Sequence, residues 1–257
     1  MDPQSLAPLT YILLAFAGFA GGLIDSIAGG GGLITVPALL AAGLPPQFAL
    51  GTNKLQSSCG TLLAVGRYAR AGLLTSPGLP LAVLCSLLAG AAGAWTVSLI
   101  HPGLLRQMIP CLLAAVALYT AVHRQFGLIP NRALLPPAVF AISCGLPLGF
   151  YDGFFGPGTG AFWTGALVSL LGLELRMATG YTKAVNLASN LGALVWFLYQ
   201  GSVHLPAAAA MICGQLVGAA LGSGLVIQRG RAIIRPVFLT VVAVLTVKLL
   251  WDALPHP

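Results

Sequence analysis

Long apolar runs alternate with short polar or glycine-rich stretches along the whole chain. A helix needs about 20 apolar residues to cross a hydrocarbon core of roughly 30 Å. Eight runs have about this length, whereas two runs of roughly a dozen residues are too short to cross alone. The pattern predicts an all-α polytopic membrane protein with one short or broken helix in each half. The long runs cover residues 6–24, 54–72, 79–100, 104–122, 133–151, 183–200, 205–227 and 232–251, and the short runs cover 33–44 and 160–172.

Composition supports the membrane assignment. Of the 257 residues, 58% are hydrophobic and only 7% are charged, and the mean hydropathy is +0.94. A soluble domain with a solvated charged surface does not reach these values. The basic residues stand singly at the ends of apolar runs, so the net charge of +7 indicates membrane topology and not nucleic-acid binding. No basic segment precedes the first run, which we therefore expect to be a retained span.

The two halves of the chain resemble each other. The stretch GLIDSIAGGGGLI aligns with GFYDGFFGPGTGAF and places Asp25 on Asp152, an offset of 127 residues. The stretch ALGTNKLQSSCGT aligns with ATGYTKAVNLASN and places Lys54 on Lys183, an offset of 129 residues. Self-similarity of this kind predicts an internally duplicated architecture.

The distribution of basic residues predicts the topology. Lys54 and Lys183 are left out of the count because we expect them to have a functional role. If all ten runs count as crossings, the other ten Lys and Arg residues divide eight against two, whereas eight crossings divide them five against five. The positive-inside rule then favours five crossings per half, with both termini outside the cytoplasm. An odd number makes repeats 1–127 and 128–257 inverted, as in many secondary transporters. The eight are Arg67, Arg70, Arg124, Arg132, Arg176, Arg229, Arg231 and Arg235, and the two are Arg106 and Lys248.

A glycine cluster interrupts each half directly before its short run. Irregular backbone at membrane depth is tolerated only where it is buried in protein or lines a watery cavity. A short helix that begins after such a break directs its free N–H groups and positive dipole end toward the break, which favours an anion. We expect an anion site there, and the alternative is a tight turn at the membrane surface. The expected irregular residues are Gly29, Gly30, Gly31, Gly32, Gly156, Pro157, Gly158 and Gly160.

Asp25 and Asp152 precede the two breaks. Desolvation disfavours the charged form of a carboxylate, so we expect these residues to carry protons that couple to transport. The alternative is that each aspartate caps a helix or pairs with a cation.

Lys54 and Lys183 occupy matching positions, each at the start of an apolar run and close to amide side chains. A cation with amide donors suits the oxygens of a sulfite or sulfonate group. The alternative is that the lysines extend to the membrane interface. The predicted substrate-binding residues are Asn53, Lys54, Gln56, Thr159, Lys183, Asn186 and Asn190.

These motifs, above all GFYDGFFGPGTGAF followed by ATGYTKAVNLASN, resemble the sulfite exporter TauE/SafE family, which is grouped with organosulfonate permeases. The resemblance extends over essentially the whole chain. It implies movement of sulfur-containing anions such as sulfite, sulfoacetate or other sulfonates across the bacterial inner membrane. The first glycine cluster departs from the second because it contains no Pro or Thr where the second has Pro157 and Thr159.

Two other functions compete with transport. An intramembrane aspartyl protease would need a GxGD motif, which is absent because Asp25 follows GGLI. A passive anion channel on the same fold stays open, since sequence does not separate a gated pathway from alternating access. The five widely spaced cysteines and four histidines form no metal or cofactor motif. We therefore predict a non-enzyme without metal or cofactor, whose partners are the lipid bilayer, a small anion and protons, and the oligomeric state is left open.

Overall fold

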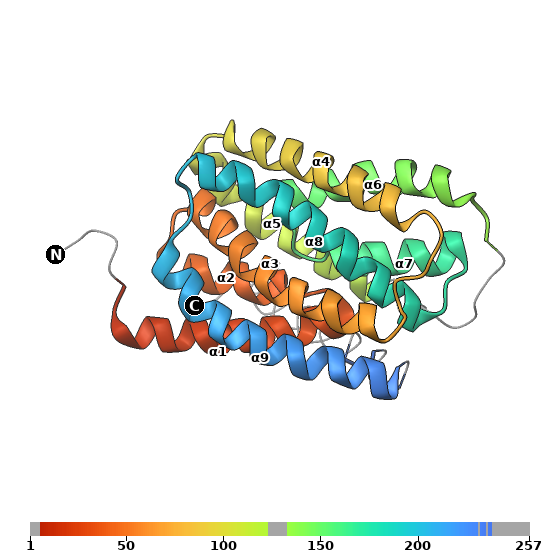
Figure 1. Cartoon of the computed structure of the whole chain (residues 1–257). Coiled ribbons are helices and arrows are strands. Elements are labelled where there is room, and N and C mark those ends of the chain that lie inside the picture. The colour runs from red at the N-terminus through yellow and green to blue at the C-terminus, as the bar shows by residue number, and fades with distance from the viewer. Residues whose placement is uncertain (1–5, 123–132, 231, 235, 238–257) are drawn as a thin grey trace.

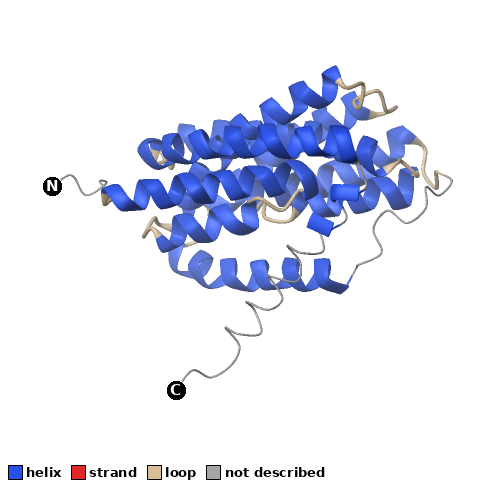
Figure 2. Ribbon diagram, turned by 90° about the horizontal axis from the view of Figure 1, so that it is seen from below, coloured by secondary structure: helices blue, strands red, loops and turns tan. Residues whose placement is uncertain are grey.

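The computed structural model describes residues 6–122, 133–230, 232–234 and 236–237, and every regular element in this part of the chain is a helix (Figures 1 and 2). Three helices, α1, α4 and α9, are both long and apolar enough to span a membrane. The helices are α1 (Pro8–Ala28), α2 (Gly32–Ala41), α3 (Pro46–Arg70), α4 (Leu79–Ser98), α5 (Pro102–Val122), α6 (Pro137–Phe154), α7 (Thr159–Leu171), α8 (Leu175–Tyr199) and α9 (Leu205–Arg229).

Most helices match the predicted runs, but α3 and α8 begin eight residues earlier than predicted, at Pro46 and Leu175. Their first turns are rich in polar residues, which a hydropathy pattern excludes from a membrane helix. Thr52, Asn53, Thr179 and Thr182 are buried, and Gln47 and Arg176 are half-buried, so both helices continue through these polar stretches. Most of the last predicted run, 232–251, lies outside the described residues.

Each short helix folds back along the bundle after the long helix that precedes it, so that α1–α2 and α6–α7 are helical hairpins (Figure 1). We name the two ends of the bundle after the first and last residues of α9. Leu14 of α1 and Leu39 of α2 both pack near Ala207, at the Leu205 end. The hairpin of α6 and α7 opens at the opposite Arg229 end, where the N–H of Leu134 donates to the Leu170 carbonyl over 2.8 Å.

The longest helix contacts connect the first half of the chain to the second. Helix α1 packs along α9, α4 packs along α6 and α8, and α3 lies against both α8 and α9. Glycines permit the closest approach, because a Cβ on Gly214 or Gly218 would collide with the carbonyl oxygens of Ala15 and Phe19 on α1. Small residues play this role at interfaces between membrane helices.

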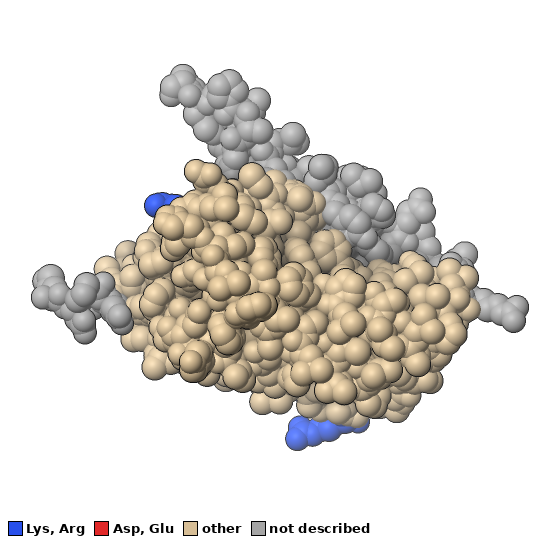
Figure 3. Space-filling model, turned by 90° about the horizontal axis from the view of Figure 1, so that it is seen from above, with Lys and Arg blue, Asp and Glu red and all other residues tan. Residues whose placement is uncertain are grey.

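The charged side chains that the structure describes lie at the ends of the bundle or deep inside it. In the view of Figure 3, basic side chains appear only at the periphery and acidic ones are not visible on that face. Arg176 donates to the Ile227 carbonyl over 2.7 Å, which places it at the Arg229 end. Arg67 and Arg70 end α3 close to the same part of α9. The apolar faces between the two ends are suited to contact lipid.

Candidate functional site

Both helix breaks depend on glycine. Gly29 ends α1 with φ of +78°, and Gly156 and Gly158 follow α6 with φ of +95° and +83°. Side chains other than glycine rarely adopt positive φ, because their Cβ then crowds the backbone. The Thr159 hydroxyl donates to the Gly156 carbonyl over 2.7 Å and so satisfies a backbone acceptor inside the second break.

The two breaks contact each other inside the protein. A Cβ added to Gly29 would lie only 2.5 Å from the Cα of Gly160, and one added to Gly32 would lie 3.1 Å from the Cα of Pro157. The residues of both breaks are buried or half-buried. A tight turn at the membrane surface, the alternative considered for the glycine clusters, is therefore wrong, since the tips of the two hairpins meet in the interior.

Lys54 of α3 binds the aspartate of the other half. Its ammonium nitrogen lies 2.8 Å from Asp152 Oδ1 and 2.9 Å from Asn190 Oδ1, and it also donates to the Asp152 backbone carbonyl. The second carboxylate oxygen of Asp152 accepts from the Ser189 hydroxyl. Lys54 and Asp152 are 1% and 5% exposed in their side chains, so this ion pair is fully enclosed.

Lys183 of α8 makes the reciprocal pair with Asp25 of α1, at 3.0 Å to Oδ2. The two pairs differ in accessibility, because the Asp25 side chain is 18% exposed while Lys183 is 1% exposed. The two carboxylates also differ in the number of side-chain hydrogen bonds that they accept. Among the described residues, Asp25 accepts a side-chain hydrogen bond from Lys183 alone, whereas both carboxylate oxygens of Asp152 accept one.

These pairs bear on the alternatives that the sequence leaves for the four charged residues. Lysines that extended to the membrane interface would be exposed, so that interpretation is wrong for both buried lysines. Both aspartates pair with cations, which the sequence analysis gave as an alternative to a proton-carrying role. Removing one partner of a buried pair leaves an uncompensated charge and costs several kcal/mol, so each charge depends on the opposite half of the chain.

A small polar cavity of about 20 Å³ lies between the breaks. This volume holds about one water molecule and is smaller than a sulfonate group. Four predicted substrate residues, Asn53, Lys54, Asn186 and Asn190, line it, and Lys183 contacts the lining residue Asp25. The complete lining is Asp25, Gly29, Gly32, Asn53, Lys54, Ser57, Asp152, Gly156, Gly160, Asn186 and Asn190.

Two predicted substrate residues, Gln56 and Thr159, do not line the cavity and form hydrogen bonds to neighbouring protein groups. The Gln56 amide donates to Asn53 Oδ1 over 2.8 Å and to the Ser57 hydroxyl over 2.9 Å. The Thr159 hydroxyl is bonded within the second break, and neither residue is part of the cavity lining. Gln56 therefore orients Asn53, and Thr159 stabilises the break.

Three polar residues of the site were not predicted. Thr35 donates to Asn53 Oδ1 over 2.6 Å, Ser57 lines the cavity, and Ser189 donates to Asp152. Ser57 could have been found, because the 129-residue offset places it on Asn186. The offset places a glycine opposite Ser189, so no comparison of the halves would have indicated it.

The asparagines supply hydrogen-bonding groups at the cavity. Because Asn53 Oδ1 accepts from two neighbours, its NH2 group is left without a partner among the described residues. Asn186 Oδ1 is buried and accepts no hydrogen bond within the described part of the chain. A buried polar group without a partner is costly, so both atoms are suited to a water molecule or ligand. The described residues contain no group of three metal-ligating side chains.

Comparison with known proteins extends over nearly the whole chain. The model of the sulfite exporter TauE/SafE family matches residues 14–249. The probable membrane transporter protein YfcA of Escherichia coli K12 is 38% identical over 248 residues, which are 96% of this chain and 92% of that protein. The probable membrane transporter protein ORF9 of Sinorhizobium sp is 41% identical over 97% of this chain and 96% of its own length.

A probable membrane transporter protein of Haemophilus influenzae is 37% identical over 93% of this chain and 94% of its own length. No solved structure gives a significant match. Three relatives above 30% identity, each matched over almost its full length, agree with the family model. The chain is a membrane transporter protein of the sulfite exporter TauE/SafE family.

Proposed function

We propose that this protein is a secondary transporter that moves small sulfur-containing or organic anions, such as sulfite, sulfoacetate or other sulfonates, across the bacterial inner membrane together with protons. One observation carries the proposal: two buried lysines lie where the helix breaks meet, and each is neutralised by a carboxylate of the other half. A cation in a low-dielectric interior attracts an anion strongly, and a carboxylate already held there must first be displaced.

Coupling to protons follows from competition for the lysines. A charged aspartate and an anionic substrate cannot share one ammonium group without placing an uncompensated negative charge in the interior. Protonation of the aspartate removes its charge and releases the lysine to the substrate. Loss of the proton restores the ion pair and expels the anion. The substrate and the proton thus enter and leave the site together.

The charges of the site set the expected stoichiometry. Lys54 and Lys183 contribute two positive charges, and Asp25 and Asp152 contribute two negative charges. A monovalent anion that enters with one proton leaves the net charge of the site at zero, and a divalent anion needs two. We propose that Asp25 takes the first proton, because it is the more exposed carboxylate and has a single side-chain partner.

We further propose that residues 1–127 and 128–257 are inverted repeats of one membrane domain. The contact of α1 with α9 has its counterpart in the contact of α6 with α4, and the two hairpins open toward opposite ends (Figure 1). Arg67, Arg70, Arg176 and Arg229 gather at the Arg229 end, which is then cytoplasmic by the positive-inside rule. Both termini would lie on the other side, and the last run lies outside the described residues.

The proposal is tested by uptake into proteoliposomes that contain the purified protein. Radiolabelled sulfite, sulfoacetate and taurine are supplied with and without an imposed pH gradient. We expect flux of at least one anion to increase with a gradient that drives protons in the same direction. Flux that ignores the gradient would indicate a passive anion channel, and no flux of any of the three would remove the proposed substrate class.

Two variants make the test specific to the site. Lys183→Gln should raise the KM for the anion at least tenfold, since it removes one of two buried cations while keeping a polar side chain. Asp25→Asn should retain binding but lose the stimulation by the pH gradient, because an amide cannot exchange a proton. Arg106→Gln serves as the control, because it also removes one positive charge but from an exposed position. This variant should transport the anion as the unmodified protein does.

A further inference from the structure

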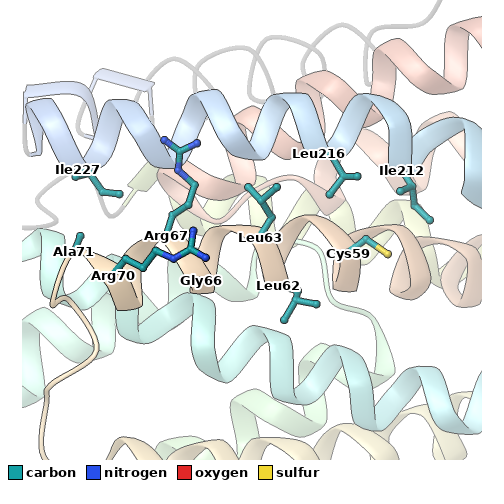
Figure 4. Close-up of a pocket in the computed structure, with 10 residues that line it drawn as sticks. All are labelled: Cys59, Leu62, Leu63, Gly66, Arg67, Arg70, Ala71, Ile212, Leu216 and Ile227. Carbon is teal, nitrogen blue, oxygen red and sulfur yellow. The ribbon is translucent and has the colours of Figure 1, made fainter.

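An elongated groove lies between α3 and α9, away from the helix breaks (Figure 4). We call it the α3–α9 groove. It encloses about 1000 Å³ and opens to the side of the bundle. Leu62, at its outer edge, is 60% exposed, as expected of a side chain that faces lipid. The groove is lined by Cys59, Leu62, Leu63, Gly66, Arg67, Arg70, Ala71, Ile212, Leu216 and Ile227.

Two arginines mark one end of the groove. Arg67 is half-buried, Arg70 is exposed, and both guanidinium groups are seen beside the groove in Figure 4. Neither forms an ion pair within the described part of the chain. The described carboxylates are Asp25, Asp152 and Glu174, and Glu174 makes no ion pair either. Within the described residues, the positive charge of the groove therefore has no ion-pair partner.

The rest of the lining is apolar, and its length fits one leaflet of a bilayer. From Arg70 to Cys59 the groove follows α3 for 11 residues, which is about 16 Å at a rise of about 1.5 Å per residue. Half of the roughly 30 Å hydrocarbon core is about 15 Å. A molecule that filled the groove would have an anionic group at the membrane surface and an apolar chain that reaches the bilayer centre.

We propose that the α3–α9 groove binds an anionic phospholipid, with the headgroup phosphate between Arg67 and Arg70 and one acyl chain along Leu63 and Leu216. Arginine binds phosphate through paired N–H donors, and basic pockets between membrane helices recognise lipid headgroups. A soluble anion would leave the apolar length of the groove unfilled. A second copy of the chain brings only Glu174 as an exposed, described carboxylate, so it offers too few partners for two arginines.

The headgroup contact is tested by native mass spectrometry of the full chain in detergent, titrated with phosphatidylglycerol or phosphatidylcholine. We expect tighter binding of phosphatidylglycerol. Arg67→Ala and Arg70→Ala should each weaken it about fivefold and together about 25-fold, from the attraction of one basic residue to an anionic surface. Arg106→Ala, at the Leu205 end, is the matched control and should leave it unchanged. Equal binding of the two lipids, or equal loss in the control, would overturn the proposal.

The acyl-chain contact is tested by filling the groove. A Cβ on Gly66 meets no atom within 4 Å, so the side chain of Gly66→Leu starts in open space at the groove, and leucine favours the helix. This variant keeps both arginines and should still lose phosphatidylglycerol. If it binds the lipid normally, or if glycerol phosphate displaces the lipid at equal concentration, the site takes a soluble anion and the proposal is wrong. A dimer that dissociates in the double arginine variant would identify a second copy as the occupant.

Discussion

Replacing Lys54 by Met should lower the free energy of unfolding by about 3–5 kcal/mol, because it strands a buried carboxylate. Asp152→Asn should lower the free energy of unfolding by a similar amount, since it leaves the buried ammonium group of Lys54 without a counter-charge. The double variant should lose less than the sum of the two single losses, because it leaves no uncompensated charge in the interior. Two neutral side chains of similar volume need no desolvation of charge, so replacing a whole buried pair is often neutral or stabilising.

The geometry of the pair sets this magnitude. Across 2.8 Å, the Coulomb attraction is about 6 kcal/mol at an effective dielectric constant near 20. Asn190 and the Asp152 carbonyl still face position 54 after the change, and they become acceptors without a donor. The pair of Lys183 and Asp25 should show a smaller coupling, because water reaches Asp25 and can solvate the carboxylate that is left.

The assay is a denaturant titration of the detergent-solubilised protein, followed by circular dichroism, for the four proteins of a double-mutant cycle. A coupling energy of about 3 kcal/mol or more is expected between Lys54 and Asp152. Additive losses, with the double variant as unstable as the sum of the single ones, would refute the reasoning that the two charges neutralise each other. The same cycle on Lys183 and Asp25 provides the comparison within one chain.

Four further variants, one of which is a control, test the surroundings of the site by the same titration. Gly29→Ala and Gly72→Ala replace glycines of nearly equal φ, +78° and +72°, and both should cost about 1–2 kcal/mol from backbone strain. Gly29→Ala should cost at least about 1 kcal/mol more, since only there does the Cβ meet the opposite break; equal losses would contradict that contact. Ser189→Ala should cost about 1.5–3 kcal/mol because Asp152 loses a buried donor, and an unchanged midpoint would show that water replaces it. Tyr68→Phe should cost about 1 kcal/mol for its 2.7 Å hydrogen bond to a backbone carbonyl, and no loss would mean that the bond adds nothing to stability.

The positions of the helix breaks could be read from the sequence. The short helices begin at Gly32 and Thr159, one residue before the predicted starts, because glycine clusters end the preceding helices. The first turns of α3 and α8 could not be found in this way. Asn53 lies in a stretch that hydropathy treats as a loop, yet it is buried inside a helix, since its partners belong to other helices.

Comparing the two halves of the sequence singled out the four charged residues but not their pairing. The repeat identified Asp25, Lys54, Asp152 and Lys183 as special residues. It contained no information on which aspartate meets which lysine, because that depends on how the hairpins approach each other in space. Ser189 is the clearest example of what sequence reasoning missed, since a single serine in an apolar helix carries no pattern.

The crossed pairing constrains how the protein is made. Lys54 enters the membrane 98 residues ahead of its partner Asp152, a delay of roughly 5–20 s at a synthesis rate of about 5–20 residues per second. Asp25 precedes Lys183 by 158 residues. During this interval neither Asp25 nor Lys54 has the partner that it has in the folded protein. Both ion pairs can form only after the second half has been made, so the first half cannot complete this site alone.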